Sequence, residues 1–142
     1  MPFKDSDDMY DIIGGFFETV KDSEQTRQVV ENNEADEAYD ALVTFVYHNP
    51  EGKVTWIEGT NGGLEVICGE TDRTPEMEFE QTADVGNQFW QGKLDLTQAL
   101  ARQQIQARGP LSKAMKIIPQ LDWIYPKYRE YLQEKDRDDL LL

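Results

Sequence analysis

The residues of this chain that could carry acid–base or nucleophilic chemistry are few and isolated. His48 is the only histidine, and it directly precedes the turn residues Asn49 and Pro50. A catalytic base needs a second group to orient it and a substrate proton within hydrogen-bond reach. Cys68 is the only cysteine and lies in a β-branched segment, where a buried cysteine behaves as a small hydrophobic residue. We therefore expect His48 to be a surface group, Cys68 to be unreactive, and the chain to have no catalytic residue.

The acidic residues are numerous, but only one group of them is regularly spaced. Glu76, Glu78 and Glu80 alternate with Met77 and Phe79. On a strand, residues two apart lie about 7 Å from each other on one face, and no neighbouring loop offers further ligands. A solvated strand face is typical of this alternation. We predict no metal site here.

Other site patterns are also missing from the sequence. It has no glycine-rich phosphate loop and no set of His and Cys residues at metal-ligand spacing, so we expect no metal and no cofactor. Nothing singles out a pair among the 28 acidic residues. A small hydrolase or thioesterase that uses such a pair is the least favoured function.

Composition narrows the class of protein further. The 142 residues include 28 acidic and 14 basic side chains, a net charge of −14 that repels nucleic acid and anionic lipid headgroups. The acidic surface is either a device for solubility or salt tolerance, or a docking surface for a basic partner. No apolar run approaches the ~20 residues of a membrane span, the first residues lack a signal-peptide core, and one cysteine suits a reducing compartment. We expect one cytoplasmic domain without a transmembrane segment.

Apolar residues recur at helical spacing over residues 9–20, after acidic residues that favour a helix N-terminus. Gly14 and Gly15 interrupt this helix, which is either a core-facing helix with a weak point or a flexible lid. A second, mostly solvated helix is predicted from Ser23 to about Asn33.

Strand signals begin at about residue 41. β-branched and aromatic residues separated by turn residues predict a three-stranded antiparallel meander. The predicted strands, with the two later ones, are residues 41–47, 53–58, 64–69, 76–81 and 104–108. The fold class is therefore α/β (α+β), a five-stranded, mainly antiparallel sheet with helices that cover one face.

The last part of the chain is predicted to be helical. Pro110 suits a first helical turn, and Leu111, Ala114, Met115 and Ile118 fall at i, i+3, i+4 and i+7, which predicts one buried face. Two prolines interrupt the helical pattern after Ile118, and a last helix is expected from about residue 126. Residues 136–142 are interpreted as a loose tail or as a segment that docks on a neighbouring subunit.

Between residues 89 and 121 the chain has a distinctive order of short motifs. A Gly-Lys-Leu turn at residues 92–94 is followed by a helical Ala-Leu segment, a strand that ends in Gly109, and a helix with Ala-Met-Lys at residues 114–116. This order resembles the sterol carrier protein type 2 (SCP2) lipid-transfer family. Before residue 89 only the order of elements agrees. The resemblance implies a single SCP2-like domain over residues 1–142, with a C-terminal helical extension from about residue 120.

The same resemblance implies a function. It implies an apolar tunnel between sheet and helices that binds and transfers one lipid inside the cell, such as a fatty acid, acyl-CoA, phospholipid or sterol, without catalysis. Periodicity alone does not distinguish such a tunnel from a solid core. The expected lining residues are Phe16, Phe17, Val20, Phe45, Trp56, Phe79, Phe89, Trp90, Leu100, Met115, Ile118 and Ile124. Met115 is the most adaptable of them, because its thioether is flexible.

The chain departs from the family pattern in its acidity and in residues 123–142. The C-terminal piece either closes the tunnel mouth or forms a homodimer or enzyme interface through Trp123, Tyr125, Tyr128 and Tyr131, residue types enriched at such surfaces. The alternative function is an accessory protein that docks through its acidic surface on an enzyme of lipid or isoprenoid metabolism.

Overall fold

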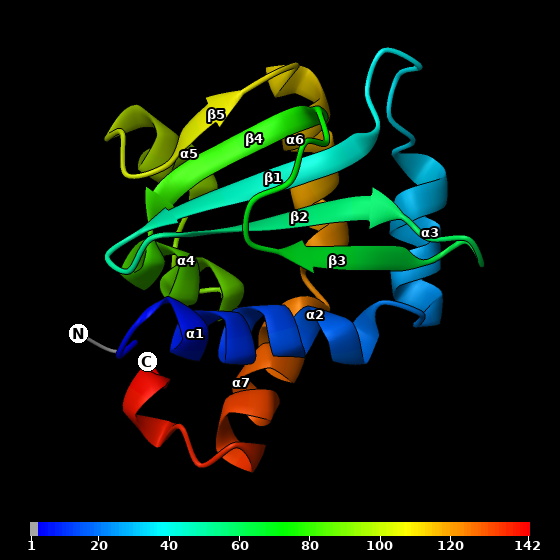
Figure 1. Ribbon diagram of the computed structural model, residues 1–142. Coiled ribbons are helices and arrows are strands. Elements are labelled where there is room, and N and C mark those ends of the chain that lie inside the picture. The colour runs from blue at the N-terminus through cyan, green and yellow to red at the C-terminus, as the bar shows by residue number, and fades with distance from the viewer. Residues whose placement is uncertain (1–2) are drawn as a thin grey trace.

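A computed structural model describes residues 3–142, and its centre is one five-stranded sheet (Figure 1). The strands are β1 (Ala41–His48), β2 (Gly52–Glu58), β3 (Leu64–Cys68), β4 (Pro75–Thr82) and β5 (Gln106–Arg108). They lie in the order β3-β2-β1-β4-β5. β1 is parallel to β4, and the other three pairings are antiparallel. The predicted fold class is confirmed.

The helices lie behind and below the sheet in Figure 1, with α6 passing behind β1 and β2. They are α1 (Ser6–Met9), the π-helix η1 (Tyr10–Gly14), α2 (Gly15–Val20), α3 (Glu24–Asn32), α4 (Ala83–Trp90), α5 (Leu96–Ala101), α6 (Leu111–Ile117), the 3₁₀-helix η2 (Ile118–Leu121), α7 (Ile124–Glu134) and the 3₁₀-helix η3 (Asp138–Leu140). The last long helix thus begins at Ile124, two residues before the predicted start.

Aromatic rings fill the space between the sheet and α4. The ring of Trp90 lies 4.8 Å from that of Phe17 and 5.3 Å from that of Phe45, measured between centroids. Trp90 Nε1 donates a hydrogen bond to the hydroxyl of Tyr47 at 3.1 Å. This buried bond satisfies the polar end of both side chains, so the two rings are fixed relative to each other.

The glycine pair in the first helix allows close packing. A Cβ at Gly14 would collide with Cys68 Sγ, and one at Gly15 would lie 2.6 Å from the hydroxyl oxygen of Tyr131. The helix is therefore held against β3 and α7, as the core-facing interpretation requires. Cys68 itself is exposed at the end of β3, so the prediction that it is buried is wrong. Partial desolvation raises the pKa of its thiol, which does not favour the reactive thiolate.

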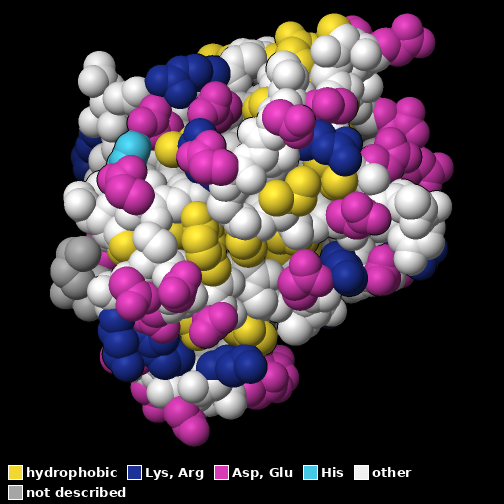
Figure 2. Space-filling model, viewed as in Figure 1, with side chains coloured by type: hydrophobic (Ala, Val, Ile, Leu, Met, Phe, Trp, Pro, Cys, Tyr) yellow, Lys and Arg dark blue, Asp and Glu magenta, His cyan; other side chains and the backbone are white. Residues whose placement is uncertain are grey.

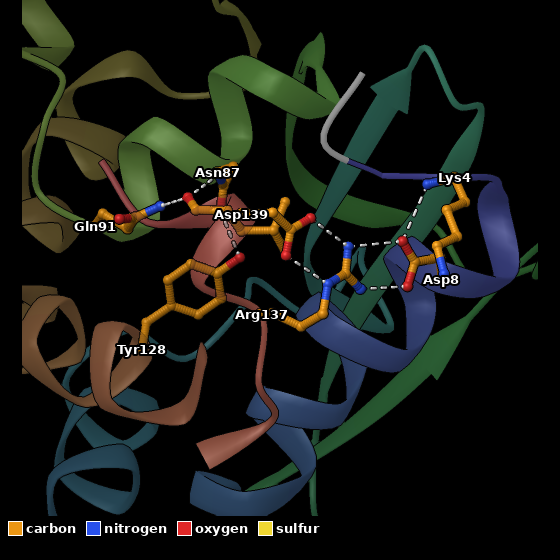
Figure 3. A network of polar contacts seen from close by, with 8 residues as sticks. Lys4, Asp8, Asn87, Gln91, Tyr128, Arg137 and Asp139 are labelled. Carbon is orange, nitrogen blue, oxygen red and sulfur yellow. Dashed lines mark hydrogen bonds and ion pairs between the residues drawn. The ribbon is translucent and has the colours of Figure 1, made fainter. Parts of the chain in front are cut away.

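The C-terminal residues are not a loose tail. Leu140 is fully buried, and its carbonyl oxygen accepts hydrogen bonds from Asn87 Nδ2 at 2.9 Å and Gln91 Nε2 at 2.8 Å (Figure 3). Arg137 binds both carboxylate oxygens of Asp8, at 2.6 and 3.1 Å. Burial alone would raise the pKa of Asp8, but the hydrogen bonds and charge of Arg137 outweigh it and lower the pKa. The tail thereby joins the first helix to α4.

The proposed aromatic interface is largely occupied by the chain itself. Tyr128 is fully buried, and its hydroxyl donates to Asn87 Oδ1 at 2.9 Å (Figure 3). Tyr131 is 8% exposed and packs on Phe16. The structure does not support an interface through these two tyrosines and favours the inward alternative, because α7 turns them toward α2 and α4.

The glutamates of β4 are paired rather than freely solvated. Glu76 is buried and forms an ion pair with Lys113 of α6. Arg108 of β5 contacts Glu78 at 3.7 Å and Glu80 at 3.1 Å. Across residues 3–142, no group of three or more His, Cys, Asp or Glu side chains is placed to hold a metal ion. The glutamates contribute instead to the attachment of α6 and β5.

Acidic side chains spread over the face of the molecule shown in Figure 2, with Lys and Arg side chains between them. Apolar side chains are visible between these charged groups, above the first helix. None of the helices in the described part of the chain is both long and apolar enough to cross a bilayer.

Candidate ligand cavity

An apolar cavity lies between the inner face of the sheet and the helices. Its walls come from α3, the central strands, α4 and the α6–η2 segment (residues 111–121). The space open to the centre of a water-sized sphere is about 40 Å³. The alternation of the strands explains the wall that they form, since residues two apart in β1 and β4 point to the same face.

Six of the predicted lining residues meet at this cavity. They are Phe45, Trp56, Phe79, Phe89, Trp90 and Ile118. Three others, Phe17, Val20 and Ile124, line a smaller void of about 10 Å³. The two cavities share the lining residues Val29, Trp56, Leu64 and Leu121. Most of the predicted set therefore surrounds one continuous aromatic region.

The remaining three predicted residues lie elsewhere. Phe16 packs between Phe17 and α7, and Leu100 borders a separate surface hollow near Leu111. Met115 is 41% exposed on α6 and lies outside the cavity lining. The structure does not support the adaptable lining role predicted for Met115.

Several lining residues were not predicted. They are Val29, Val30, Asn33, Leu42, Val43, Leu64, Met77, Gln81, Gly86, Leu96, Ile105, Ile117 and Leu121. Met77 was recognisable, because its alternation with Phe79 places both on one face of β4. Val29 and Val30 were also recognisable, because they are the only strongly apolar residues of their helix. Asn33 carries no such signal, since its position next to the cavity depends on where α3 ends.

The α6–η2 segment is a wall with few buried residues. Ala114 is the only buried residue of α6, and Leu111 is 55% exposed. Polar contacts hold the segment in place. Lys113 Nζ donates to the carbonyl oxygen of Glu34 at 2.6 Å, and Asn33 Nδ2 donates to Gln120 Oε1 at 3.0 Å. A segment with little buried apolar surface is the part of a fold that opens most readily.

His48 lies at the far end of β1 between two carboxylates. Its Nε2 is 2.6 Å from Glu80, and its Nδ1 is 2.9 Å from Glu51. Hydrogen bonds to Glu80, and then to Glu51, raise the pKa of the imidazole, and the bond from His48 lowers that of Glu80. His48 is partly exposed and lies apart from the cavity. Its bond to Glu80 links β1 to β4, and this link stabilises the fold most at acidic pH.

Because the pKa of His48 is raised in the folded state, its contribution to stability is complete below the unfolded pKa of about 6.5 and is lost as pH rises through the folded value. We expect His48→Gln to lower the free energy of unfolding at about pH 5.5, by no more than about 1 kcal/mol since the pair is partly exposed. The difference should shrink toward about pH 9. Urea unfolding across this range measures it, and a deficit independent of pH would contradict the assignment.

Comparisons with known proteins bear on the fold. The sequence matches no protein-family model and no curated protein. The structure is similar to the sterol carrier protein domain 2 of Helicoverpa armigera, with a TM-score of 0.60 and 17% identity over 80% of this chain and 84% of that one. It is also similar to the UbiJ-SCP2 ubiquinone synthesis protein, with a TM-score of 0.58 and 12% identity over 87% and 95%.

Part of a larger protein has a similar structure. The stereoselective inverting sec-alkylsulfatase Pisa1 from Pseudomonas sp. matches with a TM-score of 0.50 and 20% identity over 60% of this chain. The chain spans only 13% of the length of that sulfatase. The similarity to the two sterol carrier protein 2 structures covers most of both chains. The chain has the sterol carrier protein 2 fold.

Proposed function

We propose that this protein binds one hydrophobic lipid in the cavity and carries it, without catalysing a reaction. The observation that supports this most is the lining itself. Its side chains are apolar except for Asn33 and Gln81. Small-molecule sites in proteins are lined mostly by hydrophobic and aromatic side chains with a few polar groups. The candidate ligands are a fatty acid, an acyl-CoA, a phospholipid or a sterol-like lipid, and the fold of named sterol carrier proteins supports this choice.

The ligand would enter by displacing the α6–η2 segment. A cavity of about 40 Å³ has room for little more than water, so an acyl chain requires the walls to separate. Ile117, Ile118 and Leu121 of this segment form one wall. Outward movement would break few apolar contacts, because only Ala114 and Leu121 of residues 111–121 are buried.

Affinity would come from the burial of methylene groups. Each buried CH₂ contributes about 0.8 kcal/mol, which corresponds to about a fourfold change in the dissociation constant. In a series of primary alcohols from about eight to about sixteen carbons, we expect binding to tighten by about fourfold per CH₂ until the chain outgrows the opened cavity.

Tryptophan emission is a suitable readout for this series, because Trp56 and Trp90 both line the cavity. Isothermal titration gives the stoichiometry independently. Affinity that does not depend on chain length, or a signal that does not saturate, would contradict binding in an enclosed cavity.

A further inference from the structure

Asn33, one of the residues that line the cavity, has a buried acceptor that no described residue uses. The residue is 5% exposed, and its Nδ2 donates to the Val29 carbonyl at 2.7 Å and to Gln120 Oε1 at 3.0 Å. Gln120 Nε2 is itself committed to the Lys116 carbonyl at 3.1 Å. A backbone carbonyl only accepts hydrogen bonds, so both amides are fixed in orientation. Asn33 Oδ1 is therefore the side-chain atom of this residue that has no hydrogen-bond partner in the described structure.

This oxygen is buried and has no hydrogen-bond partner among residues 3–142. Leaving a buried acceptor unpaired costs roughly 1–3 kcal/mol. Since Asn33 is one of the residues that line the cavity, a ligand with a hydrogen-bond donor at this point would recover that cost. An apolar chain alone would not.

Trp56 supplies an unpaired hydrogen-bond donor, whereas Asn33 supplies an unpaired acceptor. Its indole Nε1 is a donor that is also buried without a partner in the described structure, and Trp56 lines both the main cavity and the smaller void beside it. The lining as described contains no Lys, Arg, His, Asp or Glu. An ionised headgroup brought into it would lose its hydration with no opposite charge to compensate.

We propose, resting on the lipid-carrier function above, that the cavity selects an uncharged lipid with a hydroxyl group that donates to Asn33 Oδ1. A hydroxyl group both donates and accepts, so it fits either orphaned atom. An ester or ether oxygen only accepts hydrogen bonds, so it cannot pair with Asn33 Oδ1, which needs a donor. A carboxylate or phosphate also only accepts, and carries a charge that the cavity cannot neutralise.

Three probes of equal carbon number test this inference: dodecanol, its isomer undecyl methyl ether, and dodecanoic acid. We expect dodecanol to bind about fivefold more tightly than the ether, the loss typical of one hydrogen bond. Dodecanoic acid should bind weakly at about pH 8, and its affinity should rise about tenfold per unit as the pH falls toward its own pKa, because only the neutral form enters. Dodecanol binding should not change over this range.

Variants locate the polar groups. Asn33→Leu should abolish the preference for the alcohol over the ether. Gln120→Ala is the matched control, because it removes the same bond between Asn33 and Gln120 but leaves Oδ1 in place, and the preference should persist. Trp56→Phe retains an aromatic ring without the N–H. Alcohol and ether oxygens can both accept from that N–H, so the preference for the alcohol should persist in this variant.

The outcomes separate the two proposals. Equal affinity for dodecanol and the isomeric ether in the wild-type protein, or tight binding of dodecanoate at about pH 8, would overturn the selection for a hydroxyl lipid while the carrier function stands. Both comparisons use the wild-type chain, so they hold even if Asn33→Leu does not fold. Failure of all three probes to bind would instead contradict the carrier function itself.

Discussion

Replacing Leu140 with alanine is expected to lower the free energy of unfolding by about 2–5 kcal/mol, the range for a large-to-small change in a packed core. Leu140 is fully buried although it is the third residue from the C-terminus. The substitution leaves its carbonyl free to accept from Asn87 and Gln91. The loss therefore reports the side chain alone, and urea unfolding monitored by circular dichroism measures it.

Leu142→Ala is the matched control for this experiment. Leu142 is 54% exposed, two residues further along the same segment, and surface substitutions of this kind usually change stability by less than about 0.5 kcal/mol. If Leu140→Ala changed the free energy of unfolding as little as Leu142→Ala, the C-terminal segment would be a loose tail. Its docking between the first helix and α4 would then be wrong.

The second large effect is expected on ligand binding. Ile118→Trp places a large ring on the wall that α6–η2 contributes to the cavity, where Ile118 is half-buried. Because protein interiors have little spare volume, the ring and a lipid chain cannot share the space. We expect dodecanol binding to weaken about tenfold or more, as measured by isothermal titration.

Met115→Trp adds the same ring three residues earlier in the chain. Met115 is exposed and outside the lining, so this variant should bind dodecanol as the wild-type protein does. Both variants should first be shown to fold by their circular dichroism spectra. Equal loss of binding in both, or in neither, would contradict the placement of the ligand behind α6–η2.

The contrast between Ile118 and Met115 also shows what periodicity leaves undecided. The predicted stripe was Leu111, Ala114, Met115 and Ile118, whereas the inward-facing residues are Ala114, Ile117, Ile118 and Leu121. Both sets have i, i+3, i+4 and i+7 spacing. They differ by a rotation of about 60° around the helix axis. Only packing against the sheet selects one of them.

The sheet was more predictable than the site. Alternation in β1 and β4 places Phe45 and Phe79 on one face, and the pairing of the two strands in the structure puts these residues opposite each other. The parallel pairing of β1 with β4 has no local sequence signal, since it depends on the path of the chain after β3. Asn33 and Leu140 likewise acquire their surroundings from residues far away in the sequence, with Gln120 and Asn87 as their partners.

The most direct test of the central claim is native mass spectrometry of the wild-type protein, as purified and after incubation with dodecanol, together with denaturing extraction and lipid analysis. The carrier account predicts an added mass of about one lipid per chain that disappears on denaturation, as expected for a ligand held in one enclosed cavity. A chain that carries no lipid as purified and also takes up no dodecanol would contradict it, and the apolar region would then be a packed core.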